Sequence, residues 1–302
     1  MNPQVSVVLP TYNRAQTLER SIRSVLNQTF TDFELIIVDD GSTDESNSIL
    51  RKFADLTNVI LASRPRRGCS AARNYGIRVA RGRYVAFQDS DDEWMPDKLA
   101  KAVAALEQSD KDTGVFYSDM LIVRSDGSVT DFRAPQLKPG VLINEDTRDY
   151  QVHSIGIQSA VIKRECFESV GYFDEALPRL IDLEIFIRLS DKFRFVHSDE
   201  TLVRFYLGEG ISTDGKALIK ARRHLLAKYR RRLKLQSHHL AWQYVHLALA
   251  LDENDRKYLS MLCFLRAFLA SPNHPEIRRE VSDAMRRYRG RSISERPNQS
   301  LT

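Results

Sequence analysis

Cysteine is scarce in this chain, with only Cys69, Cys166 and Cys263 among 302 residues. An odd number of widely spaced cysteines suits neither a disulfide framework nor a zinc site, so we expect three reduced, mostly buried thiols. No apolar run reaches the roughly 18 residues that a membrane-spanning helix requires. Residues 1–5 lack the charged and apolar regions of a secretory signal, so we expect a cytoplasmic protein.

The glycine-rich phosphate loop of dinucleotide-binding proteins is also missing. The pattern G-x-G-x-x-G occurs nowhere in the sequence, and residues 10–14, directly after the first apolar run, contain no glycine. A dinucleotide-binding dehydrogenase is therefore disfavoured.

The first half of the sequence alternates short apolar runs with amphipathic segments. Parallel strands joined by crossover helices produce this pattern, so we expect an α/β fold. The expected buried strands, each nearly all apolar and followed by a polar or glycine-containing turn, are 5–9, 33–38, 59–62 and 84–88. The expected helices between them are 15–27, 44–53 and 70–80.

The second half is less regular until it becomes wholly helical. A helix is expected from Pro96 to Gln108, followed by an apolar run at 115–123, a hairpin turn at 125–128 and an irregular stretch up to residue 156. We expect an α/β domain at 1–215, with a nucleotide-binding half at about 1–110 and an acceptor half at about 111–215. The remaining expected parts are a helical module at 216–288 and a disordered tail at 289–302.

The net charge of +5 comes mostly from two clusters late in the chain. The clusters are Arg222, Arg223, Lys228, Arg230, Arg231, Arg232 and Lys234, and then Arg278, Arg279, Arg286, Arg287, Arg289 and Arg291. They are either solvated helix faces or a surface that docks on anionic lipid beside a membrane-bound acceptor. Nucleic-acid binding is disfavoured, because aromatic residues are not interleaved with the basic ones.

Polar side chains follow three of the expected strands at the point where each strand ends. Ligands of open α/β sheets bind outside these carboxyl ends, so the three segments are the place to look for a site. The segments are Pro10-Thr11-Tyr12-Asn13, Asp39-Asp40-Gly41-Ser42 and Asp89-Ser90-Asp91-Asp92.

Each segment has a chemical interpretation and a plainer alternative. Tyr12 could stack on a base and Asp40 could accept a hydrogen bond from a ring N–H, but Asp-Asp-Gly-Ser is also a common turn with a helix cap. The carboxylates of Asp89, Asp91 and Asp92 repel one another unless a cation or solvent relieves them. They indicate either a Mg²⁺ or Mn²⁺ site shared with substrate phosphates, or an acidic loop that caps the helix after Pro96.

The order and spacing of these motifs resemble glycosyltransferase family 2. The nucleotide-binding half of that family is similar to VSVVLPTYN at 5–13, SIRSVLNQTFTDFELIIVDDGS at 21–42, GCSAARNYGIRVARG at 68–82 and YVAFQDSDDEWMPD at 84–97. Its acceptor-side motifs are similar to GYFDE at 171–175 and DLEIFIRL at 182–189. The resemblance covers roughly residues 4–212 and implies a GT-A fold, which is a Rossmann-like mixed sheet flanked by helices, with the helical module following it.

The resemblance also implies the donor site. Thr11, Tyr12 and Asp40 would hold a uracil-type base and ribose, and Asp39 would support that turn. The other implied donor-binding residues are Pro10, Asn13, Arg73, Asn74, Asp89 and Ser90. Asp89 and Asp91 correspond to the family's D-x-D, which binds Mn²⁺ or Mg²⁺, with Asp91 as the direct ligand.

Asp182 lies at the position of the family's catalytic base. It opens an amphipathic segment, so a plain helix N-cap is the alternative role, and Glu184 is the second candidate for the base. Members of the family more often have Glu before this Asp, where this chain has Ile181. The family's frequent histidine after the last strand has no counterpart in residues 204–209, so a third metal ligand is not identified.

The resemblance implies an inverting transferase that moves a sugar from a nucleotide-diphosphate donor, a UDP-sugar, to an acceptor hydroxyl. The acceptor would be a glycan or lipid-linked molecule in the synthesis of a surface polysaccharide or lipid-linked glycan. The enzyme would work in the cytoplasm, peripherally on the inner face of a bacterial membrane. The alternative is a non-catalytic module that binds a nucleotide sugar or a membrane surface.

Overall fold

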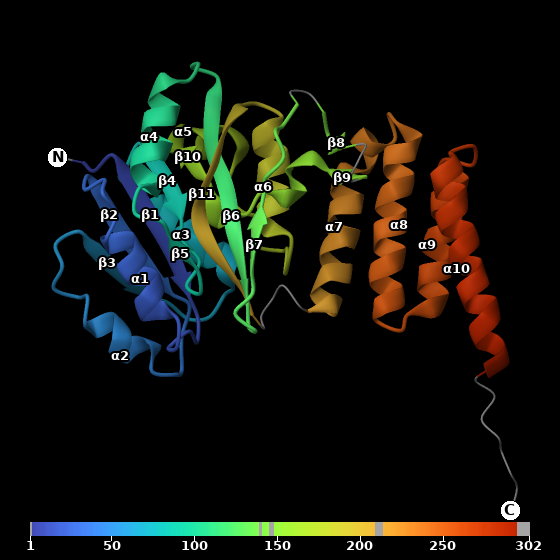
Figure 1. The fold of residues 1–302 in the computed structure, drawn as a ribbon, viewed down its shortest axis with the longest axis horizontal. Helices are drawn as coiled ribbons and strands as arrows, with labels where there is room; N and C mark the ends of the chain where they lie inside the picture. The colour runs from blue at the N-terminus through green and yellow to red at the C-terminus, as the bar shows by residue number, and fades with distance from the viewer. Residues whose placement is uncertain (1, 139–140, 145–147, 209–213, 295–302) are drawn as a thin grey trace, which may run out of the picture. The chain divides into compact units, whose positions relative to one another are not determined.

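The computed structural model describes residues 2–138, 141–144, 148–208 and 214–294 (Figure 1). The chain forms two compact units, which we call the sheet unit and the helical unit. The sheet unit comprises Met1–Leu142, Tyr150–Ala176 and Ile181–Glu209, and the helical unit comprises Ile143–Asp149, Leu177–Leu180 and Gly210–Thr302.

The sheet unit contains a mixed sheet, as expected. Its strand order is β3-β2-β1-β4-β10-β6-β11-β5, with β7 paired to β6. The strands are β1 Val5–Thr11, β2 Phe33–Asp39, β3 Val59–Ser63, β4 Tyr84–Phe87, β5 Glu93–Trp94, β6 Thr113–Arg124, β7 Val129–Phe132, β10 Val161–Lys163 and β11 Arg194–Leu207. A separate pair is formed by β8 Ile143–Asn144 and β9 Asp149–Tyr150.

Helices connect and flank these strands, so the sheet unit has the expected α/β fold (Figure 1). The α-helices are α1 Leu18–Leu26, α2 Ser46–Arg51, α3 Cys69–Val79, α4 Lys98–Gln108, α5 Arg164–Val170 and α6 Ile181–Ser190. Two single-turn helices are η1 Gln151–Ser154 and η2 Ile157–Ser159. The bounds of the four expected strands and of the expected helices are confirmed to within three residues at each end. The expected burial is wrong for β3, which lies at an edge of the sheet and has no buried residue. The expected hairpin turn is also confirmed, with Gly127 at a φ of 82° between β6 and β7.

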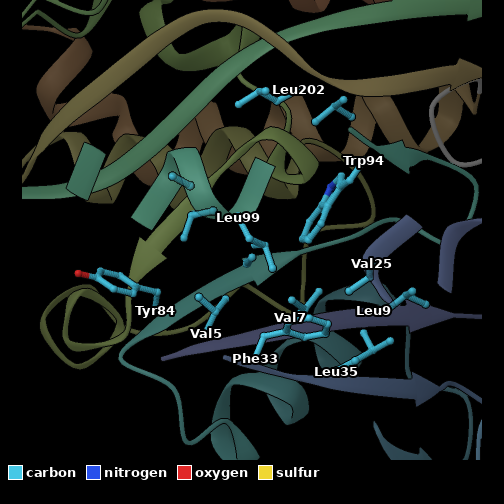
Figure 2. Close-up of a cluster of buried hydrophobic side chains, with 14 of the residues drawn as sticks. Val5, Val7, Leu9, Val25, Phe33, Leu35, Tyr84, Trp94, Leu99 and Leu202 are labelled. Atoms are coloured by element: carbon cyan, nitrogen blue, oxygen red, sulfur yellow. The ribbon is translucent and has the colours of Figure 1, made fainter. Parts of the chain in front are cut away.

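The strands β1 and β2 are buried at every residue. Val5, Val7 and Leu9 of β1 are fully buried and belong to one core cluster with Phe33 and Leu35 of β2 (Figure 2). A fully buried side chain of this size stabilises the fold by about 1.5–3 kcal/mol. The ends of these strands are therefore held in place by a well-packed core.

Gly82 lies where the turn before β4 touches the backbone of β1. A Cβ at this position would lie 2.5 Å from the Ser6 nitrogen and 2.8 Å from the Val5 carbonyl carbon. Because backbone atoms of a central strand cannot move aside, we expect Gly82→Ala to lower the free energy of unfolding by about 1–3 kcal/mol. Urea unfolding of the purified variant measures this loss.

Gly208→Ala is the matched control, since a Cβ there would have no atom within 4 Å. Its unfolding midpoint should equal that of the wild type. An unchanged midpoint for Gly82→Ala would show that the approach of this turn to β1 is not as tight as described.

The helical unit is built from four helices with their own core. They are α7 Gly215–Leu233, α8 Ser237–Glu253, α9 Lys257–Ala270 and α10 Pro275–Ser294. The core cluster includes Trp242, Val245, Phe264, Ile277 and Val281. No helix in the described ranges is both long enough and apolar enough to span a bilayer.

The unit boundaries differ from the linear division expected at residue 215. Residues 143–149 join the helical unit, because the buried Asp149 carboxylate pairs with Arg222 of α7 at 2.9 Å. Residues 289–294, which were expected in the disordered tail, belong to α10, and arginine is a good helix former. The rest of that expected tail lies outside the described residues.

Candidate active site

The carboxyl ends of β1, β2 and β4 meet at one edge of the sheet. The strands are adjacent and parallel, with Thr11 of β1 opposite Asp39 of β2 and Val8 of β1 opposite Phe87 of β4. The three polar segments that follow these strands are therefore neighbours, as the sequence predicts. The turn after β1 is also bonded to the turn after β2, since the Asn13 amide donates to Ser42 Oγ at 2.9 Å.

The two aspartates that end β2 shape the surrounding loops. The buried Asp39 carboxylate accepts the Ser42 amide at 3.1 Å, which closes the turn. The Asp40 carboxylate accepts the amides of Arg67 at 2.9 Å and Gly68 at 2.6 Å. Asp39 thus supports the turn, and Asp40 fixes the loop that leads into α3.

The segment after β1 presents an aromatic face. The Arg66 guanidinium lies 4.0 Å from the centre of the Tyr12 ring, and it donates to the Tyr12 hydroxyl at 3.0 Å. Asn13 adopts a φ of 50°, the left-handed conformation that asparagine tolerates, and its side chain accepts the Thr43 amide at 2.8 Å. Pro10 and Thr11 complete β1, and the buried Thr11 hydroxyl has no hydrogen-bond partner within the described ranges.

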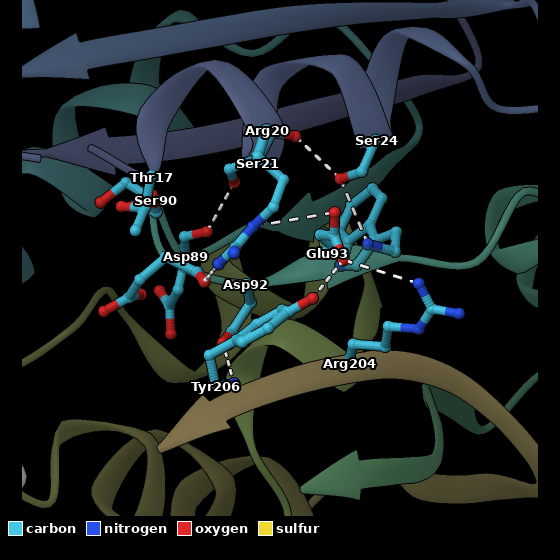
Figure 3. Close-up of polar contacts among 12 residues, drawn as sticks. Thr17, Arg20, Ser21, Ser24, Asp89, Ser90, Asp92, Glu93, Arg204 and Tyr206 are labelled. Atoms are coloured by element: carbon cyan, nitrogen blue, oxygen red, sulfur yellow. Dashed lines mark hydrogen bonds and ion pairs between the residues drawn. The ribbon is translucent and has the colours of Figure 1, made fainter. Parts of the chain in front are cut away.

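The acidic loop after β4 is held through its backbone (Figure 3). The carbonyl of Asp89 accepts a hydrogen bond from Ser21 at 2.7 Å, that of Ser90 accepts from Thr17 at 2.8 Å, and that of Asp91 accepts from Arg20 at 2.6 Å. All three donors lie in α1 or directly before it. Because the backbone makes these contacts, they leave the carboxylates of Asp89 and Asp91 to interact with other groups.

The far side of the same loop is tied to β11. Asp92 is buried, and one of its carboxylate oxygens accepts the Tyr206 amide at 2.9 Å (Figure 3). The Arg20 guanidinium lies over the Tyr206 ring, 3.7 Å from the centre of the ring. The Tyr206 hydroxyl donates a hydrogen bond to Glu93 at 2.6 Å. Asp92 therefore has a structural partner that Asp91 lacks.

Negative charge is concentrated in this loop. Burial raises the pKa of the Asp91 carboxyl, and the charge of Asp89 adds to the rise. Burial, with the charges of Asp89 and Asp91, raises the pKa of Asp92 well above its ordinary value. A bound cation would relieve this repulsion.

The residues present fit a cation that is shared with substrate. Within the described ranges, no three His, Cys, Asp or Glu side chains converge into a complete protein cage. Mg²⁺ and Mn²⁺ need no such cage, because one or two carboxylates with phosphate and water oxygens satisfy them. Asp89 and Asp91 are the carboxylates that the chain offers, and 38% of the Asp91 side chain is exposed beside Arg14, at 3.5 Å.

A buried arginine connects the acidic loop to the start of α6. Arg73 of α3 is only 3% exposed. Its Nη2 lies 2.5 Å from Asp89 Oδ1, and its Nη1 lies 3.2 Å from Asp182 Oδ1. The structure thus brings together three residues that are far apart in sequence and that were each expected in the site.

Asp182, the expected base, contacts two other elements of the sheet unit. Its second carboxylate oxygen accepts the Ile157 amide of η2 at 3.3 Å, so it contacts a different element from the helix it opens. Burial raises the pKa of Asp182, while Arg73 opposes that rise, and 30% of the side chain stays exposed. A carboxylate in this setting is more basic than a surface one and still reachable by substrate.

Glu184, the second candidate for the base, is fully buried. Its two carboxylate oxygens accept from Arg188 Nε at 2.9 Å and Nη2 at 2.7 Å, one turn along α6. This ion pair closes the carboxylate off from substrate and gives Glu184 a structural role.

Asn74 faces the motif at 171–175. Its amide donates to the Phe173 carbonyl and to Glu175, both at 3.0 Å, and accepts from the Phe173 amide at 2.9 Å. These contacts use its donors and its acceptor, so Asn74 holds this loop.

Two arginines that contact the polar segments were not expected from the sequence. They are Arg20 and Arg66, and nothing in their spacing separates them from the chain's other arginines.

Removing the charge of Arg73 should change the pH dependence of activity. Arg73 lowers the pKa of Asp182 against the effect of burial, so in Arg73→Gln this pKa rises further. A base must be deprotonated to act, so the acid limb of the kcat/KM profile should move to higher pH. Arg73→Lys keeps the positive charge and should move the limb less. An acid limb that stays in place in Arg73→Gln would contradict the assignment of Asp182 as the base.

Part of the chain is similar in sequence to known glycosyltransferases. WfgD of Escherichia coli, a UDP-Glc:alpha-D-GlcNAc-diphosphoundecaprenol beta-1,3-glucosyltransferase, is 34% identical over 132 residues, which make up 44% of this chain and 51% of WfgD. The chain thus spans about half the length of that relative.

Two solved structures share the fold. TarS 1-349 of S. aureus in complex with UDP-GlcNAc has a TM-score of 0.59 at 19% identity, covering 94% of this chain and 89% of that one. The mannosyltransferase PcManGT of Pyrobaculum calidifontis, in complex with GDP-Man and Mn²⁺, has a TM-score of 0.60 at 21% identity, covering 94% and 80%.

The family match covers more than half of the chain. Residues 6–171 match the family described as Glycosyl transferase family 2. This range contains the three polar segments and Arg73. The chain therefore belongs to glycosyltransferase family 2.

Proposed function

We propose that this protein is an inverting glycosyltransferase that moves a sugar from a UDP-sugar to an acceptor hydroxyl. The observation that carries the proposal is the chain of contacts from Asp89 through Arg73 to Asp182. It joins a carboxylate suited to the donor's diphosphate and cation to a carboxylate suited to deprotonating the acceptor.

The nucleoside would bind at the ends of β1 and β2. Tyr12 offers a ring face to the base, and the turn of Asp39 and Asp40 lies beside it, bonded to Thr11 by its backbone at 2.9 Å. Pro10 and Asn13 fix the path of the chain on either side of Thr11 and Tyr12. The diphosphate would then lie toward Asp89, Ser90 and Arg73.

The reaction would place negative charge on the leaving nucleoside diphosphate near Asp89 and a proton on Asp182. A Mn²⁺ or Mg²⁺ ion held by Asp91 and Asp89 would stabilise the negative charge that builds on the leaving nucleoside diphosphate. Asp182 accepts the proton of the acceptor hydroxyl as its oxygen attacks the anomeric carbon from the opposite face. Arg73 keeps Asp182 oriented and ionised. The configuration inverts in one displacement, with no covalent intermediate.

The relatives suggest the substrate class. WfgD is named for transfer of glucose from UDP-Glc to a GlcNAc-diphospholipid, and TarS binds UDP-GlcNAc. We propose a UDP-hexose or UDP-N-acetylhexosamine donor and a lipid-linked glycan acceptor, in surface polysaccharide synthesis. The protein would act in the cytoplasm, in peripheral contact with the membrane through the basic face of helix α7.

A donor panel tests the proposal. Purified protein with Mn²⁺ or Mg²⁺ is given UDP-, dTDP- and GDP-sugars, with and without a synthetic GlcNAc-diphospholipid acceptor, and nucleotide release is measured. We expect acceptor-stimulated UDP release from one UDP-sugar, and a product of inverted anomeric configuration. Binding of a donor without turnover under any condition would favour the non-catalytic binding module instead.

A further inference from the structure

The helical unit contains a groove with an apolar floor and a cationic rim. The groove has a volume of about 400 Å³ and is lined by α7, α8 and α9. Leu226, Leu247 and Leu262 contribute to its floor, and Arg223, Arg230 and Arg266 lie around it. We call these three residues the groove arginines.

The groove arginines have no acidic partners among the described residues. All three are exposed, and across the described ranges none of them makes an ion pair or a side-chain hydrogen bond. Helix α7 contains no Asp or Glu, and its helical periodicity places Lys216, Lys220 and Lys234, just past its end, on the same exposed side as Arg223 and Arg230. Unpaired cations on one face create a field that attracts anions.

An exposed apolar stripe borders the groove. Tyr258, Leu265 and Leu269 of α9 are 75%, 44% and 69% exposed and lie on one side of the helix, at spacings of seven and four residues. Leu262 lies on the same side and also lines the groove. The surface thus combines cations and exposed hydrophobic residues, as interfacial helices do.

We propose that this surface binds anionic bilayer lipid, with the lipid phosphate held by the groove arginines and the α9 stripe entering the headgroup region. Guanidinium groups bind phosphate through paired N–H donors, and an apolar floor suits the glycerol and upper acyl carbons. A second copy of this chain docked face to face would bring arginine against arginine, which disfavours a symmetric dimer. Lipid binding itself does not depend on the proposed function. Only its purpose does, which is to hold the enzyme beside a lipid-linked acceptor.

Vesicle binding tests the site without any nucleotide sugar. The full-length protein is co-sedimented with vesicles of phosphatidylcholine alone and of phosphatidylcholine mixed with phosphatidylglycerol. We expect binding to the mixed vesicles only. The triple variant Arg223→Gln, Arg230→Gln, Arg266→Gln should bind them roughly a hundredfold more weakly.

The matched control removes the same charge elsewhere in the helical unit. Arg278→Gln, Arg279→Gln, Arg287→Gln changes three exposed arginines of α10 and should lose far less affinity. If both triple variants weaken binding to the mixed vesicles equally, binding depends on net charge only, and the proposed lipid site is wrong. Absence of wild-type binding to the mixed vesicles would overturn it as well.

A third variant tests the apolar stripe. Tyr258→Ser, Leu265→Ser, Leu269→Ser should also weaken binding to the mixed vesicles, and it should leave the molecular mass in light scattering unchanged. If the wild type is dimeric, and the variant is monomeric but still binds the mixed vesicles, the surface serves self-association instead. None of these outcomes depends on turnover, so they stand apart from the donor panel.

Discussion

Asp182→Asn is expected to lower kcat by about 10²- to 10⁴-fold, because an amide cannot accept the proton of the acceptor hydroxyl. Asparagine has nearly the same shape and can keep the contact with the Ile157 amide, so the fold and donor affinity should persist. Steady-state turnover with saturating donor and acceptor measures the loss, and calorimetry measures donor affinity.

The matched control is Asp191→Asn, an exposed carboxylate just past the other end of α6. It should turn over at the wild-type rate. If Asp182→Asn keeps more than a tenth of wild-type kcat at saturating substrates, another group must be the base.

Asp91→Asn is expected to lower turnover by roughly a hundredfold or more, because a cation at the diphosphate contributes several kcal/mol to the transition state. The Asp91 backbone is held by Arg20 regardless of its side chain, so the loop should keep its course. The variant should also need a higher Mn²⁺ concentration for half-maximal rate. Initial rates against Mn²⁺ concentration measure both effects.

Asp126→Asn serves as control for this change, since Asp126 is an exposed residue in the β6–β7 turn. Its Mn²⁺ dependence should match that of the wild type. An unchanged Mn²⁺ dependence in Asp91→Asn would remove Asp91 from the proposed metal site.

Much of the sheet unit could be predicted from the sequence, because its first strands are buried on both faces. A strand such as β1 is nearly all apolar and ends at a polar turn, and both signals are local. The same signals predicted that the polar segments would meet, since adjacent parallel strands end at one edge. The resemblance to the family added Asp182 and Arg73, which no local pattern singles out.

Other features depend on pairing that no local pattern encodes. The three-residue β10 lies antiparallel between β4 and β6, and so short a strand gives no periodic signal. The contacts of Arg73 with both Asp89 and Asp182 require the packing of α3 against the rest of the sheet unit. The joining of residues 143–149 to the helical unit depends on the ion pair between Asp149 and Arg222.

Calorimetric titration of the wild-type protein with UDP-, dTDP- and GDP-sugars in the presence of Mn²⁺ tests the nucleotide-sugar site directly. We expect saturable binding of a UDP-sugar that weakens when a chelator removes the cation. Failure of every donor to bind with Mn²⁺ or Mg²⁺ present would contradict a nucleotide-sugar site at the ends of β1, β2 and β4.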